Sequence, residues 1–380
     1  MTDMKRLAEL REAGQSPWLD NLSRELIASG RLQRLVEDGL CGVTSNPSIF
    51  QHALAKGDRY DEALKGLLAR GLRNSRQLFF ALALEDIAAA ADVLRPVWER
   101  TDGGDGFISL EVGPELAFDS AATIEEATRL FESLNRRNVM IKVPGTLPGL
   151  TAIEKLIAAG VNVNVTLLFS VARYRQVMEA YLGGLEARLA AGQPIKDVAS
   201  VASFFVSRVD VLVDKLLDQR LEDAGSGLSE KLRALRGRAA VANARLAYQA
   251  FREVVSGSRF QSLERHGARV QRLLWGSTST KDPSYSDIKY VQELIGRDTV
   301  NTMPEDTLVA FADHGAVRET ITEDLDQAGP LFAELAELGI DLQVVTDRLE
   351  VEGVQKFADA FDQLLAGLAA KRDLFMRGGL

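Results

Sequence analysis

Three short segments of the chain place aliphatic residues at every second position, and each has polar or charged residues among the positions between them. These segments are 107–112, 139–143 and 161–166. Side chains alternate between the two faces of a β-strand, so each segment would present an aliphatic face and a polar face, the latter carrying Glu111, Lys142 and Asn164. This pattern constrains the fold most, because it suits a parallel barrel in which the aliphatic faces meet an outer ring of helices and the polar faces converge inside.

The rest of the chain continues the alternation of strand and helix. Five further strands are expected, at 18–20, 39–48, 198–206, 273–275 and 299–304. Eight strands, each followed by at least one helix, predict an α/β fold, a single (β/α)8 TIM barrel over residues 1–380. It would carry an enlarged helical segment at about 209–268 and a C-terminal helix at about 350–372. A doubly wound open sheet is the alternative, but no glycine fingerprint follows an early strand.

Local signals also predict where some helices begin. One helix is expected over 22–38, directly before the second strand. Thr123 with Glu126, and Thr151 with Glu154, have the spacing of a capping box and predict two further helix starts. These predictions rest only on residues that are neighbours in the sequence.

Charge and composition argue against several classes of function. The formal net charge is −9 at pH 7 and the pI is about 5.2, which argues against a surface for nucleic acid or for an anionic membrane. No apolar run is long enough to span a bilayer. Cys41 is the single cysteine and cannot form an internal disulfide. With no signal peptide at the start, this favours a cytoplasmic protein in which Cys41 is a buried packing residue.

Four motifs at the ends of these strands together resemble the transaldolase family. They are Thr-Ser-Asn-Pro-Ser at 44–48, Ile-Lys-Val-Pro at 141–144, Asn-Val-Thr-Leu-Leu-Phe-Ser at 164–170 and Ser-Phe-Phe-Val-Ser-Arg at 203–208. The resemblance covers nearly the whole chain and fits the longer bacterial branch best. It implies a class I Schiff-base enzyme of the non-oxidative pentose phosphate pathway. Such an enzyme moves a dihydroxyacetone unit between sedoheptulose 7-phosphate or fructose 6-phosphate and glyceraldehyde 3-phosphate or erythrose 4-phosphate.

The resemblance also implies a role for individual side chains. Lys142 would form the imine, Asp20 would act as acid and base, and Glu111 with Thr166 would hold the catalytic water. The residues implied to bind substrate are Asn46, Asn164, Ser203, Arg208 and Lys281, the last in place of an arginine that shorter members have after the seventh strand. No cofactor and no metal is implied, and sugar phosphates are the expected partners. The sequence leaves open whether the chain forms a homo-oligomer.

The reaction explains why such residues are needed. Cleavage of the C3–C4 bond of a ketose leaves an electron pair beside C2, and a protonated imine at C2 accepts it better than a ketone. Only a neutral amine forms an imine, and with an ordinary pKa near 10.4 about one lysine in a few thousand is neutral at pH 7. Burial disfavours the charged form, so a barrel interior is a suitable place for Lys142.

Each candidate residue has a structural alternative when it is taken alone. Asp20 could be the N-cap of a helix, and Glu111 could be a structural ion-pair partner of Lys142. Arg208 could pair with Asp210 or with another nearby acid. Three polar residues could do no more than satisfy interior hydrogen bonds, namely Asn162, Asn164 and Ser203, and this role is expected for Asn162.

Three other functions compete with the transferase. A metal-dependent aldolase would need clustered histidines, whereas His52, His266 and His314 are scattered. A Schiff-base lyase that cleaves fructose 6-phosphate outright is the second alternative. Its relatives are shorter and lack a glutamate at the position of Glu111. A catalytically inactive barrel that acts as a scaffold is the third, and the presence of Lys142, Asp20 and Glu111 together argues against it.

Overall fold

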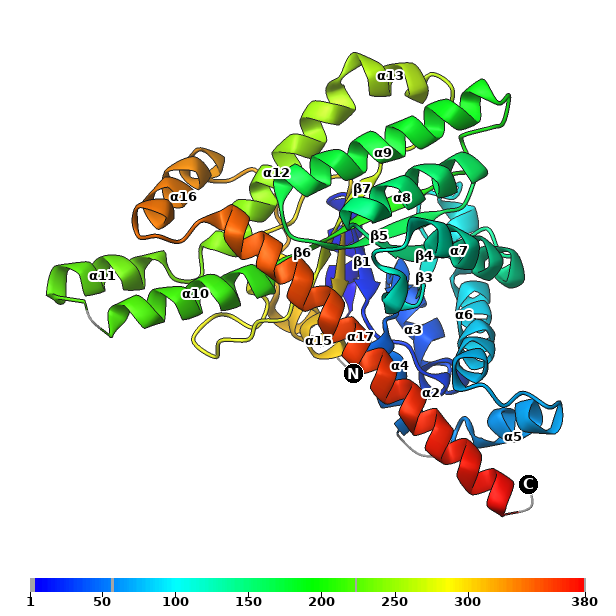
Figure 1. Cartoon of the computed structure of the whole chain (residues 1–380). Coiled ribbons are helices and arrows are strands. Elements are labelled where there is room, and N and C mark those ends of the chain that lie inside the picture. Colours follow the sequence, from blue (N-terminus) through cyan, green and yellow to red (C-terminus); the bar gives the residue numbers. More distant parts are fainter. Residues whose placement is uncertain (1–3, 56–57, 223, 379–380) are drawn as a thin grey trace.

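The computed structural model describes residues 4–55, 58–222 and 224–378, and its centre is a closed barrel of eight parallel strands (Figure 1). Neighbouring strands follow sequence order, and β1 pairs with β8 to close the ring. The strands are β1 (Gln15–Leu19), β2 (Gly42–Thr44), β3 (Phe107–Glu111), β4 (Val139–Pro144), β5 (Val163–Leu168), β6 (Ser200–Phe205), β7 (Arg272–Gly276) and β8 (Thr299–Met303). The predicted (β/α)8 TIM barrel is therefore confirmed.

The inner and outer faces of the strands carry different residues, as their alternation predicted. Val139, Ile141 and Val143 of β4 are fully buried in the main core, which includes the helices around the barrel. Met140 points the other way, into the barrel. There it packs in a layer of apolar side chains that we call the apolar floor, formed with Trp18, Cys41, Phe107, Val201, Leu274 and Val300. The floor fills the half of the barrel at the N-terminal ends of the strands. Lys142, two residues beyond Met140, lies in the other half.

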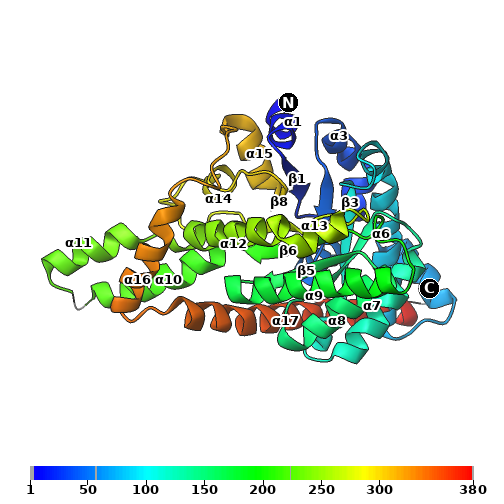
Figure 2. The same ribbon diagram turned by 90° about the horizontal axis from the view of Figure 1, so that it is seen from above.

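Helices follow the strands in alternation. Up to the sixth strand they are α1 (Lys5–Glu12), α2 (Arg24–Ala28), α3 (Arg31–Glu37), α4 (Pro47–Ala55), α5 (Asp61–Ala69), α6 (Ser75–Arg100), η1 (Pro114–Leu116), α7 (Ser120–Leu134), α8 (Leu147–Ala159) and α9 (Val171–Ala190). After it they are α10 (Ser207–Leu221), α11 (Ser226–Leu235), α12 (Ala239–Ser256), α13 (Ser258–Glu264), α14 (Lys289–Gln292), α15 (Glu305–His314), η2 (Leu325–Gln327), α16 (Ala328–Glu337) and α17 (Leu342–Arg377). Helices α10, α11 and α16 extend to one side of the barrel (Figure 2).

The predicted helix over 22–38 is wrong, because the structure has two helices there. Gly30 lies between α2 and α3 with a φ of 70°, a left-handed conformation that interrupts a helix and that glycine adopts at little cost. A helix that was not predicted, α4, follows β2 almost directly. The side chain of Asn46 caps it, since Oδ1 accepts a hydrogen bond from the Ile49 amide (3.0 Å).

Both predicted capping boxes are also wrong. Helix α7 begins three residues before Thr123 and has Asp119 as its N-cap, while α8 is capped by Thr146. Glu126 lies buried inside α7, where its carboxylate accepts a hydrogen bond from the Gly113 amide (2.7 Å). The side chain is thus used by the loop after β3 rather than by the start of its own helix.

The 36-residue helix α17 crosses the barrel at the C-terminal ends of the strands (Figure 1). It packs against α4, α6 and α10. Gln51 of α4 donates a hydrogen bond to Gln363 of α17 (2.8 Å), and Arg173 at the start of α9 lies 3.5 Å from the carboxylate of Glu350. These contacts bring side chains of α17 within reach of the barrel interior. Within the described residues, no helix has the length and apolar character needed to cross a membrane.

Candidate active site

Lys142 is the centre of a cluster of polar side chains at the C-terminal end of the barrel. It lies on the inner face of β4, and only 5% of its surface is exposed. Its Nζ donates a hydrogen bond to the carbonyl oxygen of Ser45 (3.2 Å) and lies 3.6 Å from Oε2 of Glu111. The ring centroid of Phe357, on α17, is 6.0 Å from Nζ. These contacts hold the amine in a place from which most bulk water is excluded.

Glu111 stands opposite Lys142 in the register of β3 and β4. Burial raises the pKa of Glu111 to about 7; the charge of Lys142 opposes this effect, and the carboxylate of Asp20 adds to it. Neither carboxylate oxygen of Glu111, nor the hydroxyl of Thr166, has a hydrogen-bond partner among the residues that the structure describes. A carboxyl group with a pKa near neutrality can give or accept a proton at physiological pH.

Asp20 follows β1 directly and lines the cavity that Lys142 enters. Its Oδ1 accepts a hydrogen bond from the hydroxyl of Thr44 (2.7 Å). Burial raises the pKa of Asp20, while the charge of Lys142 and the hydrogen bond from Thr44 act in the opposite direction. The alternative that Asp20 is a helix cap is wrong. The N-cap of α2 is Ser23, whose hydroxyl accepts a hydrogen bond from the Leu26 amide (3.1 Å).

Three neutral polar side chains predicted to bind substrate lie close to Lys142. Asn164 stands opposite Lys142 in the register of β4 and β5. Its Nδ2 donates to Ser109 (3.0 Å), and its Oδ1 accepts a hydrogen bond from the hydroxyl of Ser203 (2.7 Å). Ser203 and Asn46 both line the cavity. The interior hydrogen bonds thus fix the orientation of groups that border the cavity.

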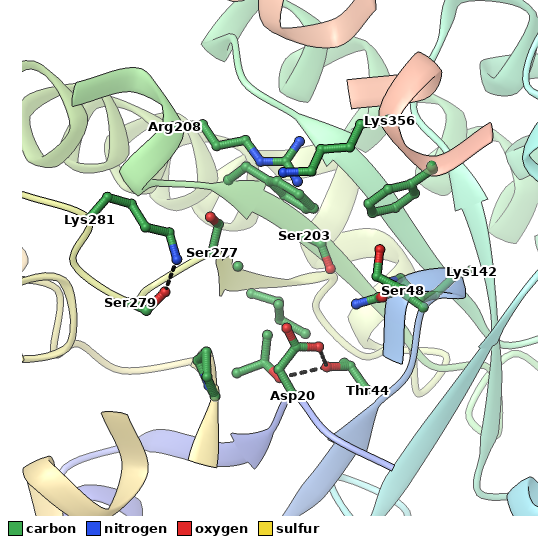
Figure 3. A pocket seen from close by; sticks show the side chains of 17 residues that line it. Asp20, Thr44, Ser48, Lys142, Ser203, Arg208, Ser277, Ser279, Lys281 and Lys356 are labelled. Atoms are coloured by element: carbon green, nitrogen blue, oxygen red, sulfur yellow. Dashed lines mark hydrogen bonds between the residues drawn. The ribbon is translucent and has the colours of Figure 1, made fainter. Parts of the chain in front are cut away.

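Three cationic side chains gather at one side of the same cavity (Figure 3). They are Arg208 from α10, Lys281 from the loop after β7 and Lys356 from α17. Burial lowers the pKa of Lys281, and the nearby charges of Lys356 and Arg208 lower it further. Asp210 is not the partner of Arg208, because its carboxylate accepts hydrogen bonds from the Ala240 amide (2.7 Å) and the Tyr290 hydroxyl (2.9 Å). The acids whose charges act on Arg208 are Asp20 and Glu352. A group of cations of this kind suits a dianion such as a phosphate ester.

The cavity has a volume of about 210 Å³ and brings together most of the predicted site residues. Six of them line it, namely Asp20, Asn46, Lys142, Ser203, Arg208 and Lys281. The remaining three, Glu111, Asn164 and Thr166, project from β3 and β5 next to β4. In the described parts of the chain, no three histidine, cysteine or carboxylate side chains are grouped so that they could hold a metal ion.

Several residues that line the cavity were not predicted from the sequence. Lys356 and Phe357 come from α17, more than 200 positions after Lys142, and no local pattern indicates that this helix returns to the barrel. Thr44 and Thr302 also line the cavity. For these two there was a signal, because both lie on the inner faces of strands that were predicted.

Comparison with known proteins assigns the family. Residues 17–368 match the family model described as Transaldolase/Fructose-6-phosphate aldolase. The chain belongs to this family. A Nostoc protein named Transaldolase 2 is 46% identical over 373 residues, which cover 97% of this chain and 98% of that protein. Proteins named Transaldolase from Parafrankia and Mycobacterium bovis are 50% and 48% identical, and they cover 95% and 97% of this chain and 96% and 97% of their own lengths.

The resemblance to the transaldolase family that was predicted from four motifs is therefore confirmed. The match extends well beyond those motifs and includes the region of α17 that carries Lys356 and Phe357. In this member of the family, the C-terminal helix thus belongs to the same matched unit as the barrel.

Proposed function

We propose that this chain is a transaldolase that transfers a dihydroxyacetone unit through a Schiff base on Lys142. The donors would be sedoheptulose 7-phosphate and fructose 6-phosphate, and the acceptors glyceraldehyde 3-phosphate and erythrose 4-phosphate. The reaction belongs to the non-oxidative pentose phosphate pathway, and we place the protein in the cytoplasm. The observation that carries the proposal is a buried amine that shares one cavity with Asp20 and with a cluster of three cations.

Lys142 attacks the C2 carbonyl of the ketose, and loss of water gives a protonated imine. The amine lies between the Ser45 carbonyl, the Glu111 carboxyl and the Phe357 ring. It is therefore held in position before the substrate arrives, which reduces the entropic cost of the attack. When the C3–C4 bond breaks, its electron pair moves into the imine to form an enamine, and the aldose leaves.

Two carboxyl groups divide the proton transfers. Asp20 takes the C4 hydroxyl proton during cleavage and later returns a proton to the oxygen of the acceptor aldehyde. Glu111 moves protons to and from water while the imine forms and is hydrolysed. A pKa of about 7 allows Glu111 to do both near neutral pH. A water molecule held between Glu111 and Thr166 would satisfy the polar atoms of both side chains that have no partner among the described residues.

The ends of the substrate are held by different groups. Asn46, Asn164 and Ser203 surround Lys142 and would bind the hydroxyls of the dihydroxyacetone unit. At the other end of the substrate, the phosphate would meet the cations Arg208, Lys281 and Lys356. Lys356 was not among the predicted residues. It adds a positive charge from α17 near Lys281, the lysine that would take the place of the arginine found after the seventh strand in shorter members of the family.

The test of this proposal is reductive trapping. Borohydride added with fructose 6-phosphate should convert the imine into a stable amine, and peptide mapping should find the three-carbon unit on Lys142. Inactivation should require both reagents. Lys281 is an internal control, because it is proposed to meet phosphate as a cation and should remain unlabelled. Lys142→Arg should abolish both labelling and turnover. A label on another residue would refute the assignment.

Product analysis separates transferase from lyase, since both use the same imine. With fructose 6-phosphate and erythrose 4-phosphate, the transferase should form sedoheptulose 7-phosphate and glyceraldehyde 3-phosphate in equal amounts. With fructose 6-phosphate alone it should release little dihydroxyacetone over many turnovers. Sustained release of free dihydroxyacetone would instead favour the lyase.

A further inference from the structure

Two threonine hydroxyls, of Thr44 on β2 and Thr302 on β8, form a hydrogen-bonded row that leads to Asp20 at the end of β1. Thr44 Oγ1 donates to Oδ1 of Asp20 (2.7 Å) and lies 2.7 Å from Oγ1 of Thr302. Both threonines are almost fully buried. Three neighbouring strands, β8, β1 and β2, thus supply one continuous row of side-chain oxygens that ends on the carboxylate.

The direction of these hydrogen bonds follows from counting protons. A threonine hydroxyl has one hydrogen, and that of Thr44 is given to Asp20. Thr302 must therefore be the donor in its contact with Thr44. Both ends of the row are also fixed through the main chain, because the Asp20 amide donates to the Met303 carbonyl (2.8 Å) and the Thr278 hydroxyl to the Thr302 carbonyl (3.1 Å).

We propose that Thr302 and Thr44 form a relay that orients the Asp20 carboxylate, so that Oδ1 is occupied and Oδ2 is the oxygen presented to the substrate. Both threonines are positioning residues, and Thr302 acts only through Thr44. The inference rests on the role proposed for Asp20. It adds one residue from β2 and one from β8 to a site whose amine, Lys142, lies on β4 and whose acid and base, Asp20, follows β1.

The relay has an electrostatic consequence as well as a geometric one. A hydroxyl that donates to a carboxylate stabilises its ionised form, so the hydrogen bond from Thr44 works against the burial that raises the pKa of Asp20. The other charged groups near Asp20 are the cations Lys142, Arg208 and Lys281 and the carboxyl of Glu111. Removing the Thr44 hydroxyl leaves all four in place and should raise the pKa of Asp20. The base would then be protonated at a higher pH.

The experiment compares the pH profiles of kcat for Thr44→Val, Thr302→Val and the corresponding serine variants. Thr44→Val should lower kcat by about 10-fold or more at pH 7 and move the acidic limb of the profile upward. Thr302→Val should also lower kcat and move the acidic limb upward, but by less than Thr44→Val. Thr44→Ser and Thr302→Ser keep the hydroxyl and should restore most of the rate. Borohydride labelling of Lys142 should persist throughout.

Double variants test whether the three residues act as one chain. Thr44→Val with Thr302→Val should be no worse than Thr44→Val alone, and neither change should matter further in Asp20→Asn. Thr123→Val is the matched control, because Thr123 is a buried threonine with one side-chain hydrogen bond on α7, away from Asp20. Additive losses, or an acidic limb that does not move in Thr44→Val, would overturn the relay. Full activity of Asp20→Asn would instead remove the proposed role of Asp20 itself.

Discussion

Glu111→Gln should change how the free energy of unfolding depends on pH. Burial raises the pKa of Glu111 from an ordinary value of 4.5 to about 7. Between these two values the folded chain holds a proton that the unfolded chain has lost, so the free energy of unfolding falls as the pH rises. At about 1.4 kcal/mol for each pH unit, Glu111 should lower the free energy of unfolding by about 3 kcal/mol in total. About 2 kcal/mol of this decrease falls between pH 5.5 and 8.5.

Urea unfolding followed by circular dichroism at pH 5.5 and 8.5 measures this loss directly. Glutamine does not ionise, so the free energy of unfolding of Glu111→Gln should fall by about 2 kcal/mol less than that of the wild type over this interval. Asp210, with a pKa of about 6, also titrates in the range, but it is common to both proteins and cancels. Glu132→Gln, at an exposed position of α7, controls for the loss of one carboxylate. The same pH dependence in wild type and Glu111→Gln would refute a Glu111 that is protonated near neutrality.

Asp20→Asn should still form the imine, as shown by borohydride labelling, but should slow cleavage and transfer by on the order of 10²-fold; transfer at the wild-type rate would leave Asp20 without a catalytic role. Arg208→Gln and Lys356→Gln should each raise KM for fructose 6-phosphate by about 10-fold. Neither change should alter the KM for dihydroxyacetone, which has no phosphate. Equal losses with both compounds would mean that the two cations are structural.

The strands and the catalytic end of the barrel could be predicted because both depend on a period-two pattern. An alternating strand needs no distant partner to reveal which side chains share a face. The pattern therefore predicts that three side chains face the barrel interior, namely Lys142, Glu111 and Asn164. The register of β3, β4 and β5 brings them side by side. Because the strands are parallel, all their C-terminal ends lie at the same end of the barrel, and the site could be predicted there.

The start of α7 could not be predicted, because a distant contact overrides the local motif there. Thr123 and Glu126 have capping-box spacing, yet Glu126 is drawn into a buried contact with the Gly113 amide and the Arg76 guanidinium (2.6 Å). Asp119 then caps the helix. The same limit applies to Lys356, which reaches the site only because α17 packs across the barrel, and helical periodicity says nothing about which neighbour a helix will meet.

The apolar floor explains why one strand can carry both the core and the chemistry. Met140 and Lys142 share the inner face of β4 and are separated by one full pleat. The floor beneath Met140 is almost fully buried and apolar, apart from the indole nitrogen of Trp18, which donates a hydrogen bond to Asp105 (2.9 Å). Lys142 lies beyond the floor, toward the rim where Glu111 and Asp20 are found. Helix α17 crosses that rim and places the Phe357 ring 6.0 Å from Nζ of Lys142 (Figure 1). The desolvation that raises the pKa values of Glu111 and Asp20 is thus a product of the floor, the strands and α17 together. A barrel with this floor but without α17 would keep the residues and lose much of the environment that tunes them.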